Sequence, residues 1–231
     1  MFKILNDITQ FNEFNKIKII IIFITRKMEE KISMILLGNS SVGKTSFILR
    51  YTESFFQPIY LTTIGIDFKV KEVELNNKKK YKLFFYDTTG QEKYRSIAVN
   101  LIKNADGVFL MYDITSKKSF DSISEWMESI FNSKPKNFPI VLIGNKLDLE
   151  DCREVETKEG EQLAKSYEIP FFETSNKDGT QVEECCLSLA NKIVEQKEEE
   201  AKQKIEKNSN NIKVEKNSQL HNKKEKRKKC C

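Results

Sequence analysis

Several residue types are scarce in this chain of 231 residues, and their scarcity excludes some classes of protein. There is one histidine, His221, and none of the five cysteines stands in a C-x-x-C spacing. A tetrahedral zinc site needs about four ligands at workable spacing. An odd number of cysteines with two adjacent pairs is also a poor disulfide framework. We therefore expect Cys152, Cys185 and Cys186 to fill the core or the surface of a protein from a reducing compartment.

The sequence also lacks an apolar run long enough to span a bilayer. Its most apolar segment ends at Ile24 and is interrupted by Lys18, whereas a membrane helix needs about 20 apolar residues. As a signal peptide this segment is weak, because acidic residues precede it and no A-x-A site follows. A second methionine, Met28, stands just before the first regular pattern. We expect residues 1–27 to be an atypical extension upstream of the true start.

Excess positive charge is confined to one end of the chain. The net charge is +5, yet 13 Lys and Arg against 7 Glu lie between Asn191 and the terminus. The basic character therefore belongs to a tail and argues against a nucleic-acid-binding face. Beyond about Gln196 no aromatic residue remains, so little apolar surface is available to offset the entropy of ordering. We expect residues 196–231 to be a disordered basic tail with a frayed helical start.

Between these ends, apolar strands alternate with amphipathic helices. GVFLMYDIT at 107–115 and PIVLIGNK at 139–146 are continuous apolar runs, which are typical of strands buried on both faces. FKVKEVEL, NNKK and KYKLFFYD predict a hairpin at 68–87. Residues 28–195 are thus predicted to form an α/β fold. It is a doubly wound, mostly parallel six-stranded sheet with one antiparallel edge strand and helices on both faces. Ligands of such sheets bind at the carboxyl ends of the parallel strands.

A phosphate-binding pattern follows the first strand. GNSSVGKT at 38–45 fits G-x-x-x-x-G-K-[ST] and opens a helix, so backbone N–H groups and the helix dipole can hold an anion there. Lys44 can reach the β- and γ-phosphates, and the Thr45 hydroxyl can bind Mg²⁺. The candidate nucleotide-binding residues of this segment are Gly38, Ser40, Ser41, Val42, Gly43, Lys44, Thr45 and Ser46.

A second motif, YDTTGQE at 86–92, ends the hairpin. Asp87 can hold Mg²⁺ through water, and the Gly90 N–H can meet a γ-phosphate. Gln91 can orient an attacking water.

The choice of base is predicted by GNKLD at 144–148. Asp148 can accept from N1–H and from the exocyclic amine of guanine, and adenine has no matching donor pair. Leaving this carboxylate unpaired would discriminate strongly against adenine. Asn145 can bridge the base and the loop backbone, and the Lys146 stem can cover the ring. ETSNK at 173–177 would close the other side of the base.

These motifs, in this order, resemble the Ras superfamily of small GTPases over residues 32–194. TTIGIDFK at 62–69, YDTTGQEKYRSI at 86–97 and the terminal double cysteine resemble its Rab branch. The resemblance implies a GTP/GDP-switched regulator of vesicle trafficking. Such a protein hydrolyses GTP slowly by itself and faster with a GAP, and it recruits effectors to membranes in the GTP state.

The resemblance also implies roles for further residues. Gln91 is the catalytic residue, and Mg²⁺ is held by Thr45, by Thr63 and, through water, by Asp87. Phe56 packs against guanine, and Ser175, Asn176 and Lys177 form the last guanine loop. Two loops, roughly 57–68 and 87–102, change with the nucleotide. The implied effector surface consists of Ile64, Gly65, Asp67, Phe68, Tyr86 and Leu101.

The two terminal cysteines acquire an interpretation through the same resemblance. The ending is not a C-a-a-X box, because Lys228 stands fourth from the end. Cys230 and Cys231 instead resemble a double geranylgeranylation site, and two lipid chains suffice for stable anchoring. The implied partners are effectors, a GEF, a GAP, a GDI or escort protein and a geranylgeranyl transferase. The implied location is the cytoplasmic face of endomembranes, with a chaperone-bound cytosolic pool.

Four positions depart from the family pattern. Tyr86 replaces Trp, and Thr89 replaces Ala beside the expected γ-phosphate, which suggests altered hydrolysis or switch closure. Asn176 replaces Ala, for which we expect a modest loss of affinity. Leu101 breaks an aromatic triad that binds effectors in the Rab branch.

Three other interpretations remain open at this point. A pseudo-GTPase would bind guanine nucleotides and turn them over little. An ATP-dependent kinase or ATPase would use the same phosphate loop, although NKLD argues against adenine. A structural adaptor would bind no nucleotide at all.

Overall fold

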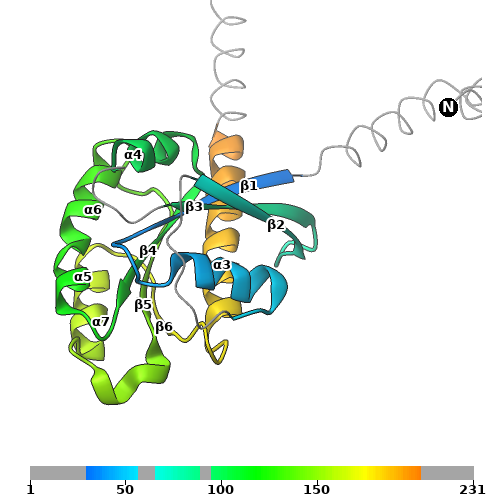
Figure 1. Ribbon diagram of the computed structural model, residues 1–231. Coiled ribbons are helices and arrows are strands. Elements are labelled where there is room, and N and C mark those ends of the chain that lie inside the picture. Colours follow the sequence, from blue (N-terminus) through cyan, green and yellow to red (C-terminus); the bar gives the residue numbers. More distant parts are fainter. Residues whose placement is uncertain (1–29, 57–65, 89–94, 204–231) are drawn as a thin grey trace, which may run out of the picture.

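The computed structural model describes residues 30–56, 66–88 and 95–203, and six strands in these ranges form one sheet (Figure 1). Their order across the sheet is β2-β3-β1-β4-β5-β6. The strands are β1 (Glu30–Leu37), β2 (Ile66–Glu74), β3 (Lys80–Thr88), β4 (Gly107–Asp113), β5 (Ile140–Asn145) and β6 (Phe171–Thr174). Edge strand β2 pairs with β3 antiparallel, and the other four pairs are parallel. The predicted sheet, with its antiparallel edge strand, is therefore confirmed.

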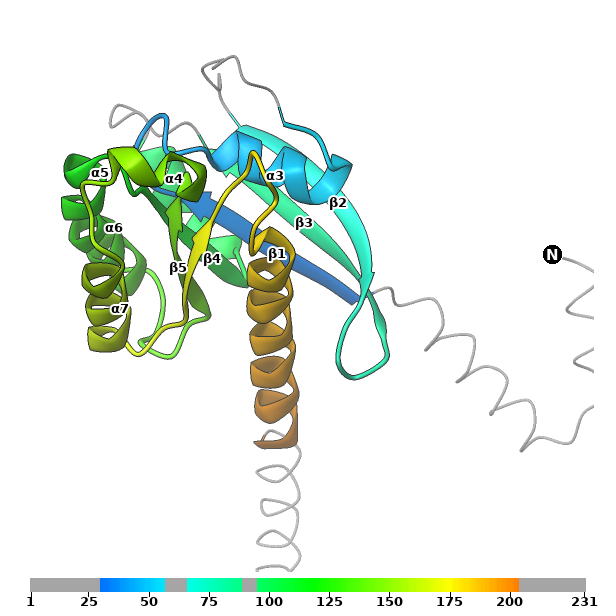
Figure 2. The same cartoon turned by 90° about the horizontal axis from the view of Figure 1, so that it is seen from below.

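Helices cover both faces of this sheet (Figure 2). One face carries α3 (Lys44–Glu53) and a helix over residues 182–203, called the C-terminal helix below. The other face carries α4 (Arg95–Asn104), α5 (Lys117–Asp121), α6 (Ile123–Phe131) and α7 (Thr157–Ser166). A short 3₁₀ helix, η2 (Leu147–Cys152), follows β5. This arrangement confirms the predicted doubly wound architecture.

The two central strands explain why the fold is layered in this way. Every residue of β4 and of β5 is buried, as continuous apolar runs require. Side chains alternate across a strand, so each strand contributes to two separate clusters. Phe109 belongs to the cluster under α3, and Leu110 belongs to the cluster under α4 and α6.

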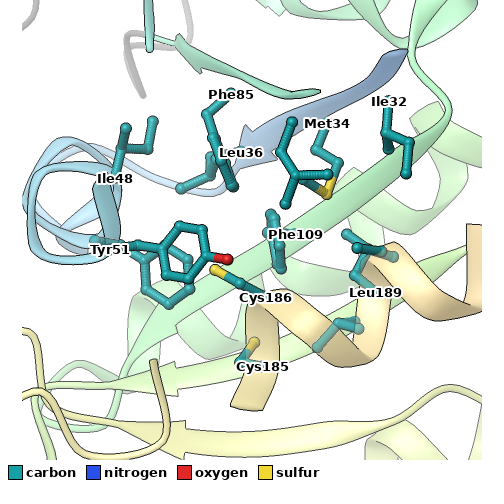
Figure 3. Packing of buried hydrophobic residues seen from close by; sticks show 14 of the residues in the cluster. Ile32, Met34, Leu36, Ile48, Tyr51, Phe85, Phe109, Cys185, Cys186 and Leu189 are labelled. Carbon is teal, nitrogen blue, oxygen red and sulfur yellow. The ribbon is translucent and has the colours of Figure 1, made fainter. Parts of the chain in front are cut away.

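Figure 3 shows the cluster between α3 and the C-terminal helix. Phe85 and Phe109 stack with ring centroids 6.3 Å apart, and Tyr51 packs edge-on against Phe85 at 5.4 Å. Cys185 and Cys186 are buried free thiols in the same cluster. The free thiol of Cys152 is exposed. The expectation that these cysteines are structural filler agrees with the described fold.

The C-terminal helix extends past the predicted boundary at residue 195 and continues to residue 203. The tail was expected to be disordered with a frayed helical start, and residues 196–203 are helical. Glu, Lys, Gln and Ala are strong helix formers, and the helix is fastened to the rest of the domain along its side. Lys197 Nζ lies 2.7 Å from Asp106 Oδ1, and Asn77 Nδ2 donates to Glu198 Oε1 at 3.1 Å.

Residues 1–27 and the rest of the tail lie outside the described residues, so the expectations for them are untested. Within the described ranges, no helix combines the length and the apolar character that crossing a bilayer requires.

Candidate functional site

The predicted motifs meet at one end of the sheet, where strands β1, β3, β5 and β6 end. The loop of residues 38–43 follows β1, Asp87 lies near the end of β3, Asn145 ends β5, and Ser175 follows β6. Side chains from three of these strand ends form hydrogen bonds to the loop or to the first turn of α3. The structure therefore brings together motifs that lie more than 130 residues apart in sequence.

The loop after β1 has a shape that only glycine accommodates at two positions. Gly38 has φ 137°, and a Cβ there would lie 2.1 Å from the Met111 carbonyl oxygen of β4. Gly43 has φ 102° and stands immediately before α3. The Gly43 carbonyl accepts the first helical hydrogen bond, from Phe47 N at 2.9 Å. The loop thus ends at a helix N-terminus, where N–H groups and the dipole favour anions.

The Lys44 side chain lies across this loop and forms hydrogen bonds to its backbone. Its Nζ donates to the Gly38 carbonyl at 2.9 Å and to the Asn39 carbonyl at 2.7 Å. The side chain is 5% exposed, and this burial lowers the pKa of Lys44 to about 8, against an opposing contribution from Asp87. A buried ammonium bound to two carbonyl oxygens is well suited to a phosphate group, because an anion would offset its desolvation.

Oxygen ligands for a cation stand beside it. The Thr45 hydroxyl donates to Asp87 Oδ2 at 2.6 Å, and Asp87 is 3% exposed. A neighbouring bond from the Thr88 hydroxyl to the Leu36 carbonyl, at 2.7 Å, fixes the end of β3 against β1. Across the described ranges, no group of three or more His, Cys, Asp or Glu residues could hold a metal by itself. One hydroxyl and one carboxylate fit Mg²⁺, which takes few protein ligands and shares the rest with water and phosphate.

Two amide side chains from the segments predicted to recognise the base form hydrogen bonds to the loop after β1. Asn145 Nδ2 donates to the Val42 carbonyl at 2.7 Å, and Asn176 Nδ2 donates to the Gly43 carbonyl at 3.0 Å. Thr174 supports the first of them, because its hydroxyl donates to Asn145 Oδ1 at 3.1 Å. A Cβ at Gly43 would lie 2.3 Å and 2.9 Å from these two amide nitrogens. The second glycine of the motif is therefore needed for close packing as well as for its backbone angle.

The predicted base-recognition side chains also lie together. The Ser175 hydroxyl donates to Asp148 Oδ1 at 2.8 Å, so the ends of β5 and β6 are linked at this carboxylate. Lys146 has φ 70°, and its Nζ lies 2.5 Å from Asp113 Oδ2. Asp113 ends β4 and was not anticipated as a partner. Phe56 is half-buried just beyond α3.

Two arginines that no motif singled out support this region. Arg50, in the last turn of α3, donates from Nε to the Asn176 carbonyl at 2.5 Å and from Nη2 to the Lys177 carbonyl. Arg153, just after η2, pairs with Glu173 at 2.6 Å and with Glu150 at 2.6 Å. Both partners of the Arg153–Glu173 pair are nearly buried, with side chains 8% and 12% exposed. The sequence marked Arg50 and Arg153 only as charged residues, which are common on helix and loop surfaces, so their partners could not be predicted.

The expected effector residues lie on and beside the edge of the sheet. Phe68 of β2 is 59% exposed and faces Tyr86 of β3 across the pair, with ring centroids 6.5 Å apart. Tyr86 and Leu101 of α4 are partly buried against the same hydrophobic cluster. Asp67 is exposed, and its carboxylate accepts from the Phe68 N–H at 2.8 Å.

Several predicted residues lie outside the described ranges, so the structure does not place them. They are Thr63, Ile64, Gly65, Thr89, Gly90, Gln91, Cys230 and Cys231. The roles assigned to them stay predictions.

Comparison with known proteins gives consistent similarities. A family model described as "Ras family" matches residues 33–195. "GTP-binding protein ypt2" of Schizosaccharomyces pombe is 40% identical over 173 residues, which cover 75% of this chain and 86% of that protein. "Ras-related protein Rab-8B" of Pongo abelii is 43% identical over 161 residues, 70% of this chain and 77% of the relative. "Ras-related protein Rab-10" of Diplobatis ommata is 43% identical over 162 residues, 70% and 80% of the two chains.

Proposed function

Since the chain belongs to the Rab branch of the Ras family of small GTPases, we propose how its residues divide the binding and hydrolysis of GTP. As a member of this branch, it is a GTP hydrolase that acts as a GTP/GDP switch in vesicle trafficking. The bond from Asn145 to the Val42 carbonyl supports the assignment of residues most directly. It joins the strand end that selects the base to the loop that binds the phosphates.

The phosphates are bound at the start of α3. Lys44 already lies across the loop with its ammonium on two carbonyls, and it would turn to the β- and γ-phosphates of GTP. The backbone N–H groups between Gly38 and Ser46 would cradle the same phosphates. When bound, Mg²⁺ neutralises charge that develops on the transferred phosphoryl group. Thr45, Thr63 and, through water, Asp87 would hold it, and the Thr45–Asp87 pair fits that role.

The reaction itself needs a correctly placed water. Gln91 would orient this water, and the Gly90 N–H would contact the γ-phosphate. Thr89 directly precedes Gly90, and we infer that its branched hydroxyl side chain alters hydrolysis or closure of the loop. Measurement of single-turnover hydrolysis by Thr89→Ala and by the wild type tests this inference. Equal rates in the two proteins would contradict it.

Guanine would lie between the ends of β5 and β6. Asp148 would accept from N1–H and from the exocyclic amine, while Asn145 would contact the base and hold the phosphate loop. Lys146 would cover one side of the ring, with its ammonium held by Asp113. Ser175, Asn176 and Lys177 would close the opposite side, and Phe56 would pack against the base.

The remaining parts of the proposal concern partners and location. GTP-state effectors would bind the surface formed by Ile64, Gly65, Asp67, Phe68, Tyr86 and Leu101. A GEF, a GAP and a GDI or escort protein would control the cycle. Geranylgeranyl groups on Cys230 and Cys231 would anchor the protein to the cytoplasmic face of endomembranes. Replacement of both cysteines by serine should move the protein to the cytosol, and a membrane-bound variant would contradict the anchor.

Competition binding tests the assignment of the base site. Fluorescent GDP should be displaced by GDP and not by ADP, and Asp148→Asn should weaken GDP binding because the two guanine donors lose their acceptor. Asp151→Asn is a matched control, since this exposed carboxylate lies in the same 3₁₀ helix. Equal weakening by both substitutions would contradict the assigned role of Asp148.

A further inference from the structure

The side chain of Asn176 makes a contact that its position in the last guanine loop does not require. The residue is 4% exposed, and its Nδ2 donates to the Gly43 carbonyl, 133 positions away in sequence. An alanine here could not form this bond. The contact therefore adds a second link between base loop and phosphate loop, beside the one from Asn145 to the Val42 carbonyl.

Arg50 of α3 also forms hydrogen bonds to the last guanine loop. Its guanidinium donates to two consecutive carbonyls, those of Asn176 and Lys177, which suits the rigid fork of arginine donors. In a trans peptide the N–H points opposite to the C=O. Arg50 therefore also directs the N–H groups of Lys177 and Asp178 away from α3. The Asp178 N–H indeed donates to the Ser175 hydroxyl, at 3.1 Å.

The two polar atoms of the Asn176 amide have opposite effects on the stability of the fold. Its Oδ1 is buried and has no hydrogen-bond partner among the described residues, while its Nδ2 is satisfied. Burial of an unpartnered acceptor is unfavourable, so the asparagine gains from its donor and loses from its acceptor. Asn176→Ala removes both contributions. It should therefore change the stability of the fold little, although it removes the link to the phosphate loop.

We propose that Asn176 and Arg50 are positioning residues that fasten the last guanine loop to the phosphate loop and to α3, and thereby slow the release of guanine nucleotide. This inference rests on the proposed function of the site. It replaces the modest loss of affinity that we expected for Asn176 from the sequence, because that expectation did not include the side-chain bond to the Gly43 carbonyl. A nucleotide held between the two loops leaves only when they separate, and both bonds must break in that step. Differences of this kind are expressed mainly in the dissociation rate.

Release of a fluorescent GDP analogue, chased by excess GDP in the presence of Mg²⁺, tests the inference in the full-length protein. Asn176→Ala should release the analogue about three- to tenfold faster than the wild type, which is the effect of one hydrogen bond. Asn176→Asp should be faster still, because it places a carboxylate oxygen against the Gly43 carbonyl. Arg50→Ala should accelerate release more than Arg50→Lys, which keeps the charge and loses the fork.

The control removes an asparagine amide at the opposite end of the sheet. Asn77 Nδ2 donates to the Tyr81 hydroxyl and to Glu198, and Asn77→Ala should release the analogue at the wild-type rate. The melting temperature should stay at the wild-type value in Asn176→Ala. A merely structural role would lower the melting temperature in parallel with the faster release.

Two outcomes would overturn the inference. One is wild-type release by both Asn176→Ala and Asn176→Asp. The other is acceleration in Asn176→Ala and Arg50→Ala that only follows a fall in melting temperature. A wild-type protein that failed to retain the GDP analogue would instead contradict the proposed function, so the two failures are distinguishable.

Discussion

Replacement of Gly43 by alanine probes the point at which the phosphate loop and the base-recognition motifs meet. The residue has φ 102°, and the added Cβ would lie 2.3 Å from Asn145 Nδ2 and 2.9 Å from Asn176 Nδ2. Neither distance is tolerable for a Cβ, so both amides must move. Gly43→Ala should therefore break the bonds to the Val42 and Gly43 carbonyls and distort the loop that we propose binds the phosphates.

The size of the effect follows from these contacts. A non-glycine residue in the left-handed region costs about 1–2 kcal/mol, and each amide hydrogen bond contributes about 0.5–1.5 kcal/mol. The sum is about 2–5 kcal/mol, which corresponds to GDP binding weakened by about 30-fold to about 5,000-fold. Titration with a fluorescent GDP analogue measures this loss directly.

Gly179→Ala is the matched control for the backbone contribution. Gly179 also has a positive φ, 87°, but within the described part of the chain its added Cβ would meet only Arg50 Cδ, at an ordinary 3.8 Å. The control should lose no more than the backbone contribution of about 1–2 kcal/mol. Equal losses of GDP affinity in the two variants would refute the claim that both amides pack on Gly43.

Three further predictions concern charge and burial. Burial lowers the pKa of Lys44 to about 8 from 10.5, so between these pH values the unfolded chain binds more protons than the folded one. Lys44 should then contribute a rise of about 3 kcal/mol in the free energy of unfolding over this pH range, measured without nucleotide as the wild-type profile minus that of Lys44→Met. The buried thiols of Cys185 and Cys186, whose pKa is raised, act in the opposite direction but are common to both proteins; identical pH profiles of the two proteins would contradict the prediction. Arg153→Ala leaves the nearly buried Glu173 without its cation and should lower the free energy of unfolding in urea by about 3–5 kcal/mol, whereas a loss below about 1 kcal/mol would fit an exposed pair. Cys185 and Cys186 are buried, and burial raises the pKa of both thiols, whereas Cys152 is exposed. In a variant with serine at positions 230 and 231, a thiol reagent should therefore label the folded protein at Cys152 and reach Cys185 and Cys186 only after unfolding. Rapid labelling of all three thiols would contradict the packing of Cys185 and Cys186.

Much of the fold was predictable because its signals are local. Continuous apolar runs identified β4 and β5, and the alternating segments around the NNKK turn identified the β2–β3 hairpin. The end of the C-terminal helix was not predictable in the same way. Its last turns contain few apolar residues, and the contacts of Lys197 and Glu198 that fasten it join segments far apart in sequence.

The site shows the same division. Lys44, Thr45, Asp87, Asn145 and Asp148 belong to short motifs whose spacing carries chemical information, and the structure brings them to one end of the sheet. Residues that act through others have no such spacing. Arg50 appeared as one more charge on a helix, and its role depends on two carbonyls more than 120 residues away. Asn176 was noticed as a departure from the family pattern, but the partner of its side chain became apparent only in three dimensions.

The central claim is that this chain binds guanine nucleotide selectively and hydrolyses it. The most direct measurement loads the purified protein with equal amounts of GTP and ATP in the presence of Mg²⁺ and removes free nucleotide. The bound nucleotide is then released by denaturation at intervals and identified by chromatography. We predict that guanine nucleotide alone is retained, and that bound GTP is converted slowly to GDP. Retention of ATP to the same extent, or GTP that stays unconverted, would contradict the account.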